Sequence, residues 1–214
     1  MSDPITELAR LIDRSERILV FTGAGMSTGS GIPDFRGPTG VWTQRTPVYF
    51  QEFVASDRAR RDYWEYKLDG WHHFRDARPN PAHLALVELE RLGKLELLVT
   101  QNIDGLHQAA GSSKQRLVEL HGSNSDCECL DCARREPAER CLTEFEKTRE
   151  PPCCRHCRGL MKPAVVMFGQ ALDMAALERC RHAAERVDLV LALGSSLVVW
   201  PAPDIPPHAA RSGA

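Results

Sequence analysis

Apolar residues near the N-terminus recur at helical spacing, whereas later ones gather in short runs. Ile5, Leu8 and Leu11 lie three positions apart, so the segment 4–14 is predicted to be a helix. Short runs rich in Leu, Ile and Val that end at glycine or at polar residues are typical of buried strands. The pattern predicts strands at 18–21, 95–99, 164–168 and 189–193, and further helices at 81–92, 106–110 and 172–186.

Strands and helices alternate along the chain, and this alternation favours an α/β domain built on a parallel sheet. Two stretches interrupt it. The first, 38–81, is rich in aromatic and charged residues and is predicted to be a helical insertion. The second, 125–161, holds most of the cysteines and is a further insertion. The tail 201–214 combines four prolines with small residues and offers no clear final element.

Charge and composition exclude several classes of protein. With 27 Lys and Arg against 29 Asp and Glu, the formal net charge is −2, so the chain lacks an overall basic footprint for nucleic acid. A hydrophobic content of 43% suits a globular protein. No apolar run reaches the roughly 18 residues of a membrane span, and the N-terminus does not resemble a secretory signal. We therefore expect a soluble, cytoplasmic protein that binds neither nucleic acid nor membrane.

A glycine-rich turn follows the first predicted strand. Gly23 and Gly25 allow a close approach of the backbone, and the N–H groups that follow can bind a phosphate. The dinucleotide fingerprint G-x-G-x-x-G fails, because Thr28 replaces the third glycine and no acidic residue follows at about twenty residues. The glycines alone fit a plain strand-to-helix turn equally well. The following sequence PDFRG favours binding, since Arg36 can pair with a pyrophosphate.

Polar residues directly follow the strand predicted at 95–99, where ligands bind in open parallel sheets. Asn102 and Asp104 are two positions apart and are expected to face the same side, in a pattern suited to holding sugar hydroxyls or a water. Asx-turn chemistry is the alternative for this pair. His121 follows an apolar strip, and its near-neutral pKa qualifies it as a general base. A purely structural histidine is the alternative there.

Eight cysteines occur in the chain, and six of them form two tight groups near positions 130 and 155. Without a signal peptide, clustered thiols indicate a metal site and not disulfides. Cys127 and Cys153 compete for the register, but only one choice gives two matched C-x-x-C turns. Four thiolates leave no open coordination position, so the metal is expected to be a structural Zn(II) ion. The predicted ligands are Cys129, Cys132, Cys154 and Cys157.

Together these segments resemble the sirtuin family of NAD-dependent protein deacylases. The matching pieces occur in the family's order and extend from residue 20 to 202. The stretch 61–83 is also similar to the class II branch of the family. The matching sequences are GAGMSTGSGIPDFRG, TQNIDGLHQAAG, LHG, the two C-x-x-C pairs, KPAVVMFG and GSSLVVWPA.

The resemblance implies a Rossmann-like parallel sheet with helices on both faces, a small zinc-ribbon module and a cleft between them. It divides the chain into a Rossmann-like NAD-binding domain (1–37, 79–124 and 163–214), a helical insertion (38–78) and a zinc-binding module (125–162). NAD would be consumed as a co-substrate, and the products would be nicotinamide, O-acyl-ADP-ribose and free lysine. Mono-ADP-ribosyl transfer and an inactive sirtuin-like protein are the alternatives.

The resemblance also assigns roles to individual residues. His121 would be the general base, with Asn102 as a second catalytic residue. A segment around Val166, Phe168 and Gly169 would pair with the substrate peptide as a strand. The residues implied in NAD binding are Gly23, Ala24, Gly25, Ser27, Asp34, Phe35, Arg36, Gln101, Asn102, Ile103, Asp104, Gly194, Ser195 and Ser196.

Three features depart from the family pattern. Gln170 stands where the family has Glu or Asp after Phe-Gly, which removes a carboxylate near the peptide cleft. The Tyr-x-x-Arg pair of the desuccinylase branch is missing. The nearest match is Tyr63 with Tyr66 and Lys67, so no preference for acidic acyl groups is predicted. The chain also stops where the family continues into a further strand and an adenosine-binding loop, so the sheet is expected to lack an edge strand.

Overall fold

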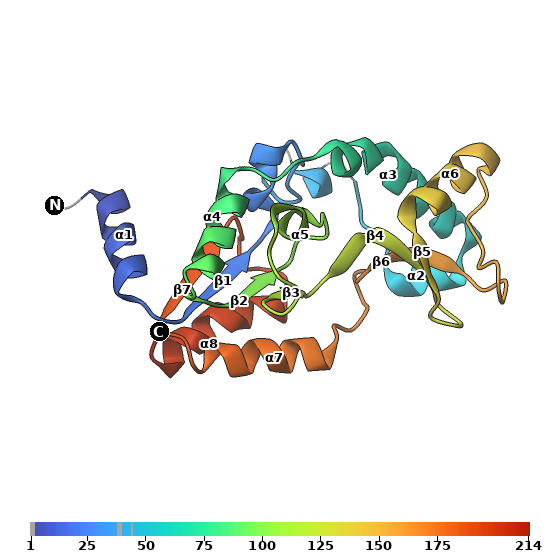
Figure 1. The fold of residues 1–214 in the computed structure, drawn as a ribbon. Helices are drawn as coiled ribbons and strands as arrows, with labels where there is room; N and C mark the ends of the chain where they lie inside the picture. Colours follow the sequence, from blue (N-terminus) through green and yellow to red (C-terminus); the bar gives the residue numbers. More distant parts are fainter. Residues whose placement is uncertain (1–2, 38–39, 44) are drawn as a thin grey trace.

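The larger of two β-sheets is parallel and has four strands in the order β3–β2–β1–β7 (Figure 1). The structure is a computed structural model and describes residues 3–37, 40–43 and 45–214. The observed order confirms the predicted parallel α/β core. One strand, β3, adds to those predicted, and it is too short to show a period in the sequence. The strands are β1 (Ile18–Thr22), β2 (Leu95–Thr100), β3 (Leu117–Glu119) and β7 (Leu189–Leu193).

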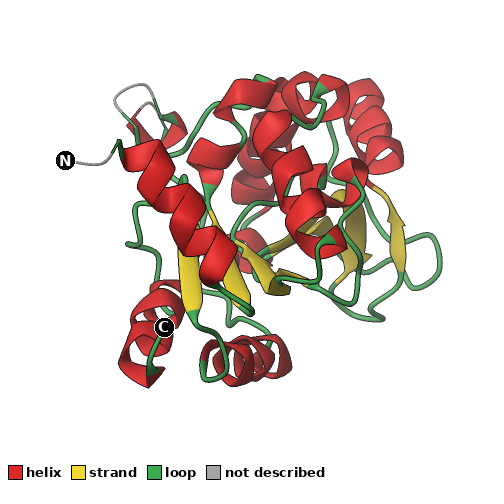
Figure 2. Ribbon diagram, turned by 60° about the vertical axis from the view of Figure 1, so that its left-hand side comes forward, coloured by secondary structure: helices red, strands yellow, loops and turns green. Residues whose placement is uncertain are grey.

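Helices cover both faces of this sheet (Figures 1 and 2). They are α1 (Pro4–Arg14), α4 (Pro81–Arg91), α5 (Leu106–Ala110), α7 (Met174–Ala184) and α8 (Ile205–Ser212). Phe21 of β1 packs with Leu177 of α7 and Ile205 of α8. Its neighbour Val20 packs on the opposite face with Leu86 of α4. Successive strand residues point to opposite faces, so a strand covered on both sides is apolar throughout.

The C-terminal segment forms the short turn η4 (Ala202–Asp204) and then helix α8, so the expectation of no final element is wrong. Pro206 and Pro207 lie in the first turn of α8, where the backbone N–H groups have no helical partner and proline is tolerated. Ile205 and Ala209 bury the apolar side of the helix in the core around α7. The prolines therefore start this helix where the sequence pattern suggested an irregular tail.

The smaller sheet is antiparallel, with strand order β5–β4–β6. It lies beside the larger sheet in Figure 1. Phe53, Trp64 and Phe145 from the three surrounding helices share one buried core with this sheet. The stretch predicted to be a helical insertion contains two of these helices, and its residues 38, 39 and 44 lie outside the described residues. The elements are β4 (Gly122–Cys129), β5 (Arg135–Pro137), β6 (Met161–Val165), α2 (Phe50–Ala55), α3 (Asp57–Asp76) and α6 (Ala138–Thr148).

The strand predicted at 164–168 is shifted and belongs to the smaller, antiparallel sheet. It is β6, which pairs with β4. The hydrophobic pattern missed the first residues of β6 because Lys162 is charged yet fully buried. The Lys162 Nζ lies 3.0 Å from Glu128 Oε1 and donates a hydrogen bond of 2.8 Å to the Val165 carbonyl. This pairing compensates the buried charge, so a residue type that normally indicates the surface occurs inside a strand.

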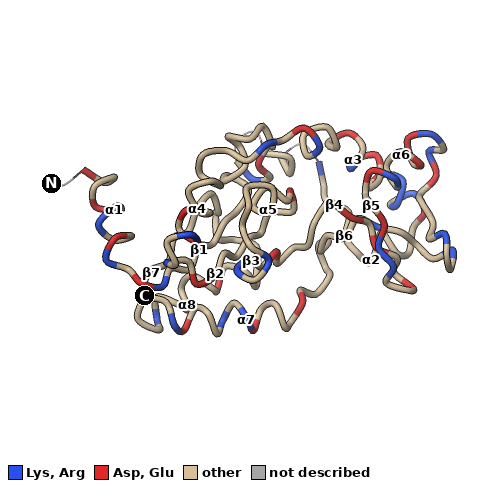
Figure 3. Tube along the Cα trace, in the orientation of Figure 1, with Lys and Arg blue, Asp and Glu red and all other residues tan. Residues whose placement is uncertain are grey.

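Acidic and basic residues are interspersed over both parts of the molecule (Figure 3). Several form ion pairs one helical turn apart, such as Arg61 with Asp57 on α3. Exposed pairs of this kind stabilise a helix by only about 0.2–0.5 kcal/mol each. Among the helices of the described residues, none is long and apolar enough to cross a membrane.

Candidate active site and metal centre

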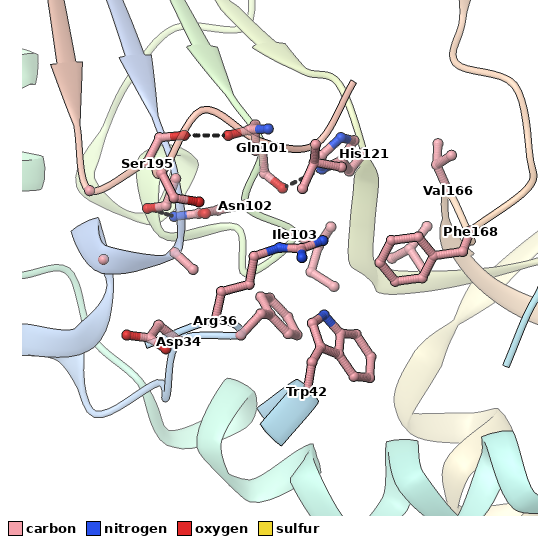
Figure 4. A pocket seen from close by; sticks show the side chains of 18 of the residues that line it. Asp34, Arg36, Trp42, Gln101, Asn102, Ile103, His121, Val166, Phe168 and Ser195 are labelled. Carbon is pink, nitrogen blue, oxygen red and sulfur yellow. Dashed lines mark hydrogen bonds between the residues drawn. The ribbon is translucent and has the colours of Figure 1, made fainter. Parts of the chain in front are cut away.

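A cavity of about 540 Å³ lies at the carboxyl ends of β1, β2 and β7 and extends to the smaller sheet (Figure 4). This volume suits a small organic ligand. Ser27, Asp104 and Gly169 are predicted site residues that lie outside the lining of this cavity as the described residues form it. The predicted residues that line it are Gly23, Ala24, Gly25, Asp34, Phe35, Arg36, Gln101, Asn102, Ile103, His121, Val166, Phe168, Gly194, Ser195 and Ser196.

The glycine-rich turn packs against the turn that follows β7. Gly23 N–H donates to the Leu193 carbonyl at 3.0 Å, and Gly25 N–H donates to the Gly194 carbonyl at 2.8 Å. These two N–H groups are therefore already paired within the chain. Two short turns, η1 (Ala24–Met26) and η2 (Thr28–Ser30), follow the strand in place of an α-helix. The glycines are needed because the chain's own backbone comes close.

Gly25→Ala is expected to lower the free energy of unfolding by about 1–3 kcal/mol. The added Cβ would lie 2.9 Å from Gly194 Cα and 3.0 Å from the Gly194 carbonyl oxygen, and neither backbone atom can rotate away. Gly70→Ala on α3 is the matched control, because no atom beyond its chain neighbours and the backbone of its own helix lies within 4 Å of its Cβ position. It should stabilise the protein by up to about 1 kcal/mol through helix propensity. Urea unfolding of both variants measures the difference, and equal shifts would contradict the packing argument.

Asn102 and Asp104 both contact Ser27, but Asn102 lines the cavity whereas Asp104 lies outside its lining. The amide nitrogen of Asn102 donates to the Gly23 carbonyl at 3.0 Å and to Ser27 Oγ at 3.1 Å, so both of its hydrogens are used. The amide oxygen is then the group of Asn102 that can accept a hydrogen bond from a ligand. Asp104 accepts from Ser27 Oγ at 2.7 Å and from the Leu106 N–H at 2.9 Å. Its carboxylate thus begins helix α5, as the Asx-turn alternative describes.

His121 lies directly before β4, at the boundary between the two sheets. Its Nδ1 lies 2.9 Å from the Gln101 carbonyl, which can only accept, so Nδ1 carries the proton and Nε2 keeps a free lone pair. Burial lowers the pKa of His121, and the hydrogen bond to Gln101 partly opposes this shift. The ring is therefore neutral at pH 7. The backbone carbonyl of His121 accepts a hydrogen bond from the Val166 N–H at 2.9 Å. This bond connects His121 to the segment after β6, which also lines the cavity.

The wall formed by the helical insertion was not among the predicted site residues. Trp42 stacks on Phe35 with ring centroids 5.4 Å apart and meets the ring of Phe168 edge-on at 5.8 Å. Lys67 donates to Asn124 Oδ1 at 2.9 Å, and burial lowers its pKa to about 7. The sequence signals were the aromatic and charged composition of this stretch and the place of Tyr63 and Lys67 as the nearest match to the Tyr-x-x-Arg pair. The lining residues that the sequence missed are Gly37, Trp42, Val48, Tyr63, Lys67, Val165, Met167 and Val199.

The sequence of this chain is similar to those of known proteins along its whole length. A model of the Sir2 family matches residues 23–201, which is most of the chain. The chain belongs to the Sir2 family. It is 41% identical over 214 residues to an NAD-dependent protein deacetylase of Rhodopseudomonas palustris, covering all of this chain and 85% of that protein. It is also 41% identical to NAD-dependent protein deacylase 2 of Archaeoglobus fulgidus, covering 100% of this chain and 83% of that protein.

Solved Sir2 structures share the fold closely. A Sir2 structure with a deacetylated p53 peptide and 3'-O-acetyl ADP ribose has a TM-score of 0.91 and 35% identity, covering 98% of this chain and 84% of that one. A Sir2 structure with a p53 peptide and NAD+ has a TM-score of 0.89 and 35% identity, covering 99% and 84% of the two chains. The cavity at the strand ends of this Sir2-family chain therefore belongs to a fold that holds such ligands in its relatives.

The four predicted metal ligands of this Sir2-family chain come together in the structure. Their sulfurs all lie within 4.8 Å of one another, although they come from two separate segments. Cys129 and Cys157 sulfurs are 3.4 Å apart, and Cys132 and Cys154 sulfurs are 3.7 Å apart. Zinc with Zn–S bonds of about 2.3 Å places tetrahedral sulfurs about 3.8 Å apart. All four are free thiols, so the set fits a closed zinc site.

Proposed function

We propose that this protein is an NAD-dependent protein-lysine deacylase that releases nicotinamide, O-acyl-ADP-ribose and free lysine. The observation that carries the proposal is the state of His121. Its imidazole is neutral, with Nδ1–H held by the Gln101 carbonyl and the Nε2 lone pair left free on the wall of the cavity. A base of this kind is what acyl transfer to a sugar hydroxyl requires.

The reaction follows from two events in the cavity. The acyl oxygen of the substrate lysine forms a bond to the anomeric carbon of the nicotinamide ribose, while the carbon–nitrogen bond to nicotinamide breaks. His121 Nε2 then takes the proton of a ribose hydroxyl, whose oxygen attacks the acyl carbon. A water molecule adds to the same carbon while its bonds to the lysine nitrogen and to the anomeric oxygen break, so the acyl group stays on the sugar and free lysine leaves. Asn102, fixed by Gly23 and Ser27, offers its amide oxygen to the ribose. Arg36 supplies a positive charge for the pyrophosphate from the cavity wall.

The substrate peptide is proposed to pair with the segment that follows β6. In this segment the Val166 N–H is bound by His121, and the Phe168 carbonyl accepts from the Phe50 N–H at 2.9 Å. The Val166 carbonyl and the Phe168 N–H make no backbone hydrogen bond within the described chain, so they can pair with an added strand. Gln170 binds the Met167 N–H at 3.2 Å, which turns its amide back onto the segment itself.

The four clustered cysteines are proposed to hold one structural zinc ion. When bound, the ion supplies folding energy to the smaller sheet and leaves no coordination position for a reactant. A cytoplasmic location is part of the same proposal, because free thiols persist in a reducing compartment.

The direct test is mass spectrometry of an acetyl-lysine peptide incubated with the purified protein and NAD. We expect the peptide to lose its acyl mass while nicotinamide and O-acyl-ADP-ribose accumulate in equal amounts. A peptide that gains the mass of ADP-ribose would show transfer of the nucleotide instead. If no nicotinamide is released with any acyl-lysine peptide, the proposed function is wrong.

The dependence of kcat/KM on pH is expected to show an acid limb that lies below about pH 6.5, the usual histidine pKa. The base works in its neutral form, so activity falls only as the pH drops through the lowered pKa of His121. At pH 7 and above the histidine contributes no further change. Circular dichroism at each pH separates this limb from acid unfolding, and a limb centred above pH 7 would contradict the assignment.

A further inference from the structure

Two buried histidines that the proposed mechanism does not use lie behind the cavity. His83 on α4 and His107 on α5 are 0% and 1% exposed, and their ring centroids are 4.9 Å apart. Burial lowers the pKa of both, and that of His107 falls to about 3. Both rings are therefore neutral at physiological pH. A neutral imidazole has one N–H donor and one acceptor nitrogen, so the partners decide which nitrogen carries the proton.

The partners of His83 leave it with an unused donor. The backbone N–H of Asn80 donates to His83 Nδ1 at 3.3 Å, so Nδ1 is the acceptor and the proton is on Nε2. This Nε2 is buried and has no hydrogen-bond partner among the described residues. An unpaired buried donor is unfavourable, because it has lost its hydrogen bond to water without gaining another.

The partners of His107 leave it with an unused acceptor. His107 Nε2 lies 3.0 Å from Thr22 Oγ1, and the Thr22 hydroxyl donates to Thr100 Oγ1 at 2.8 Å. Thr22 has then spent its only proton, so His107 Nε2 must donate, and Nδ1 keeps a lone pair. This Nδ1 is also buried without a partner in the described chain. If Thr22 instead donated to His107 Nε2, the His107 proton would be on Nδ1. Two N–H groups of neighbouring rings would then face each other, which is unfavourable.

We propose that one buried water joins His83 and His107, accepting from His83 Nε2–H and donating to His107 Nδ1, and so closes a ring of hydrogen bonds that holds Asn102. On one side, Thr100 Oγ1 accepts from the Asn102 N–H at 3.0 Å. On the other, the amide nitrogen of Asn80 donates to the Met26 carbonyl at 2.8 Å in the glycine-rich turn.

The ring returns to its start because Asn102 also donates to Ser27, the residue after Met26. This ring of hydrogen bonds thereby connects the ends of β1 and β2 and the glycine-rich turn to the starts of helices α4 and α5. His83 and His107 are positioning residues in this arrangement, and they touch no substrate. The effect of this ring on catalysis, through the position of Asn102, rests on the proposed function. Which ring nitrogen of His83 and His107 carries the proton does not depend on that function.

The order of the protons is tested on the unaltered protein by NMR of ring nitrogens after 15N-histidine labelling. Both rings are expected to be neutral with the proton on Nε2 over about pH 6–8. The His83 Nε2–H should resist exchange with solvent, because it is buried and paired. A proton on Nδ1 in either ring, or a charged ring in this range, would overturn the proposal. This readout does not depend on any enzymatic activity.

The positioning role is tested by Thr100→Val against Thr100→Ser. Valine keeps the shape of threonine but removes the hydroxyl that accepts from Asn102 and Thr22, whereas serine keeps it. We expect Thr100→Val to lower kcat for nicotinamide release about tenfold with KM for the peptide within about twofold, and Thr100→Ser to recover most of that loss. Equal kcat values for the two variants would overturn this role. If the wild type releases no nicotinamide, the proposed function fails while the NMR result still decides the ring.

Discussion

Replacement of His121 by alanine is expected to lower deacylation by about 10²–10⁴-fold, the usual contribution of a general base. The alanine cannot take the proton of the ribose hydroxyl, so the acyl group is not transferred to the sugar. Release of nicotinamide precedes this step and does not use the imidazole. Exchange of labelled nicotinamide into NAD in the presence of acyl-peptide should therefore persist in His121→Ala while deacylated peptide fails to form.

The matched control for this experiment is His182→Ala. His182 lies on the exposed surface of α7, where it pairs with Glu178 on the same helix and with Glu185 at its C-terminal cap. Its replacement should leave turnover within about twofold, since an exposed pair contributes little. Deacylation by His121→Ala at the wild-type rate would remove His121 from the mechanism. Loss of both exchange and deacylation would instead place His121 in the binding of NAD.

Cys129→Ser, or removal of zinc by a chelator, is expected to unfold the smaller sheet. Structural zinc contributes about 10–16 kcal/mol in small zinc modules, which is as large as the whole stability of a typical domain. Cys129 ends strand β4, and Cys154 lies in the loop that precedes β6. With one thiolate missing, the two segments lose the ion that joins them. Metal analysis and circular dichroism measure the loss of zinc and of structure.

Cys153→Ser is the control that distinguishes the two possible registers. Cys153 is next to Cys154 in the sequence but lies outside the cluster of four sulfurs. The variant should retain one zinc ion per chain and the stability of the wild type. Zinc loss in Cys153→Ser together with zinc retention in Cys129→Ser would show that the ligand set is wrong. A wild-type protein whose eight thiols all react freely while it is folded would show that it holds no such metal.

Zinc removal should also abolish deacylation, although the ion takes no part in the chemistry. Strand β4 begins at Gly122, directly after His121, and β6 ends at Val165, directly before the segment that binds the peptide. The thiolates lie at the other end of the same two strands. Collapse of the smaller sheet therefore removes the support for the base and for one wall of the cavity.

Local patterns were sufficient wherever one segment determines its own structure. The apolar run 18–21 is a strand, because a strand buried on both faces must be apolar throughout. The paired C-x-x-C turns indicated four sulfurs that do lie together in the structure, since the two-residue spacing itself brings each pair within reach of one ion. Patterns misled where a distant partner changes the meaning of a residue. Lys162 is inside a strand because Glu128 compensates its charge, and no local rule predicts that pairing.

The sequence by itself determined the parallel α/β core, the two paired C-x-x-C turns and the loops at the strand ends, because each follows from periodicity or from spacing within one segment. Only the tertiary structure decided which atoms of these loops are free. Gly25 has its N–H bound by Gly194, and Asp104 begins a helix in place of facing the cavity. The position of Lys67 on the cavity wall was likewise decided by packing of α3. Hydrogen-bond partners and burial depend on residues far away in the chain, and these set the chemistry of each group.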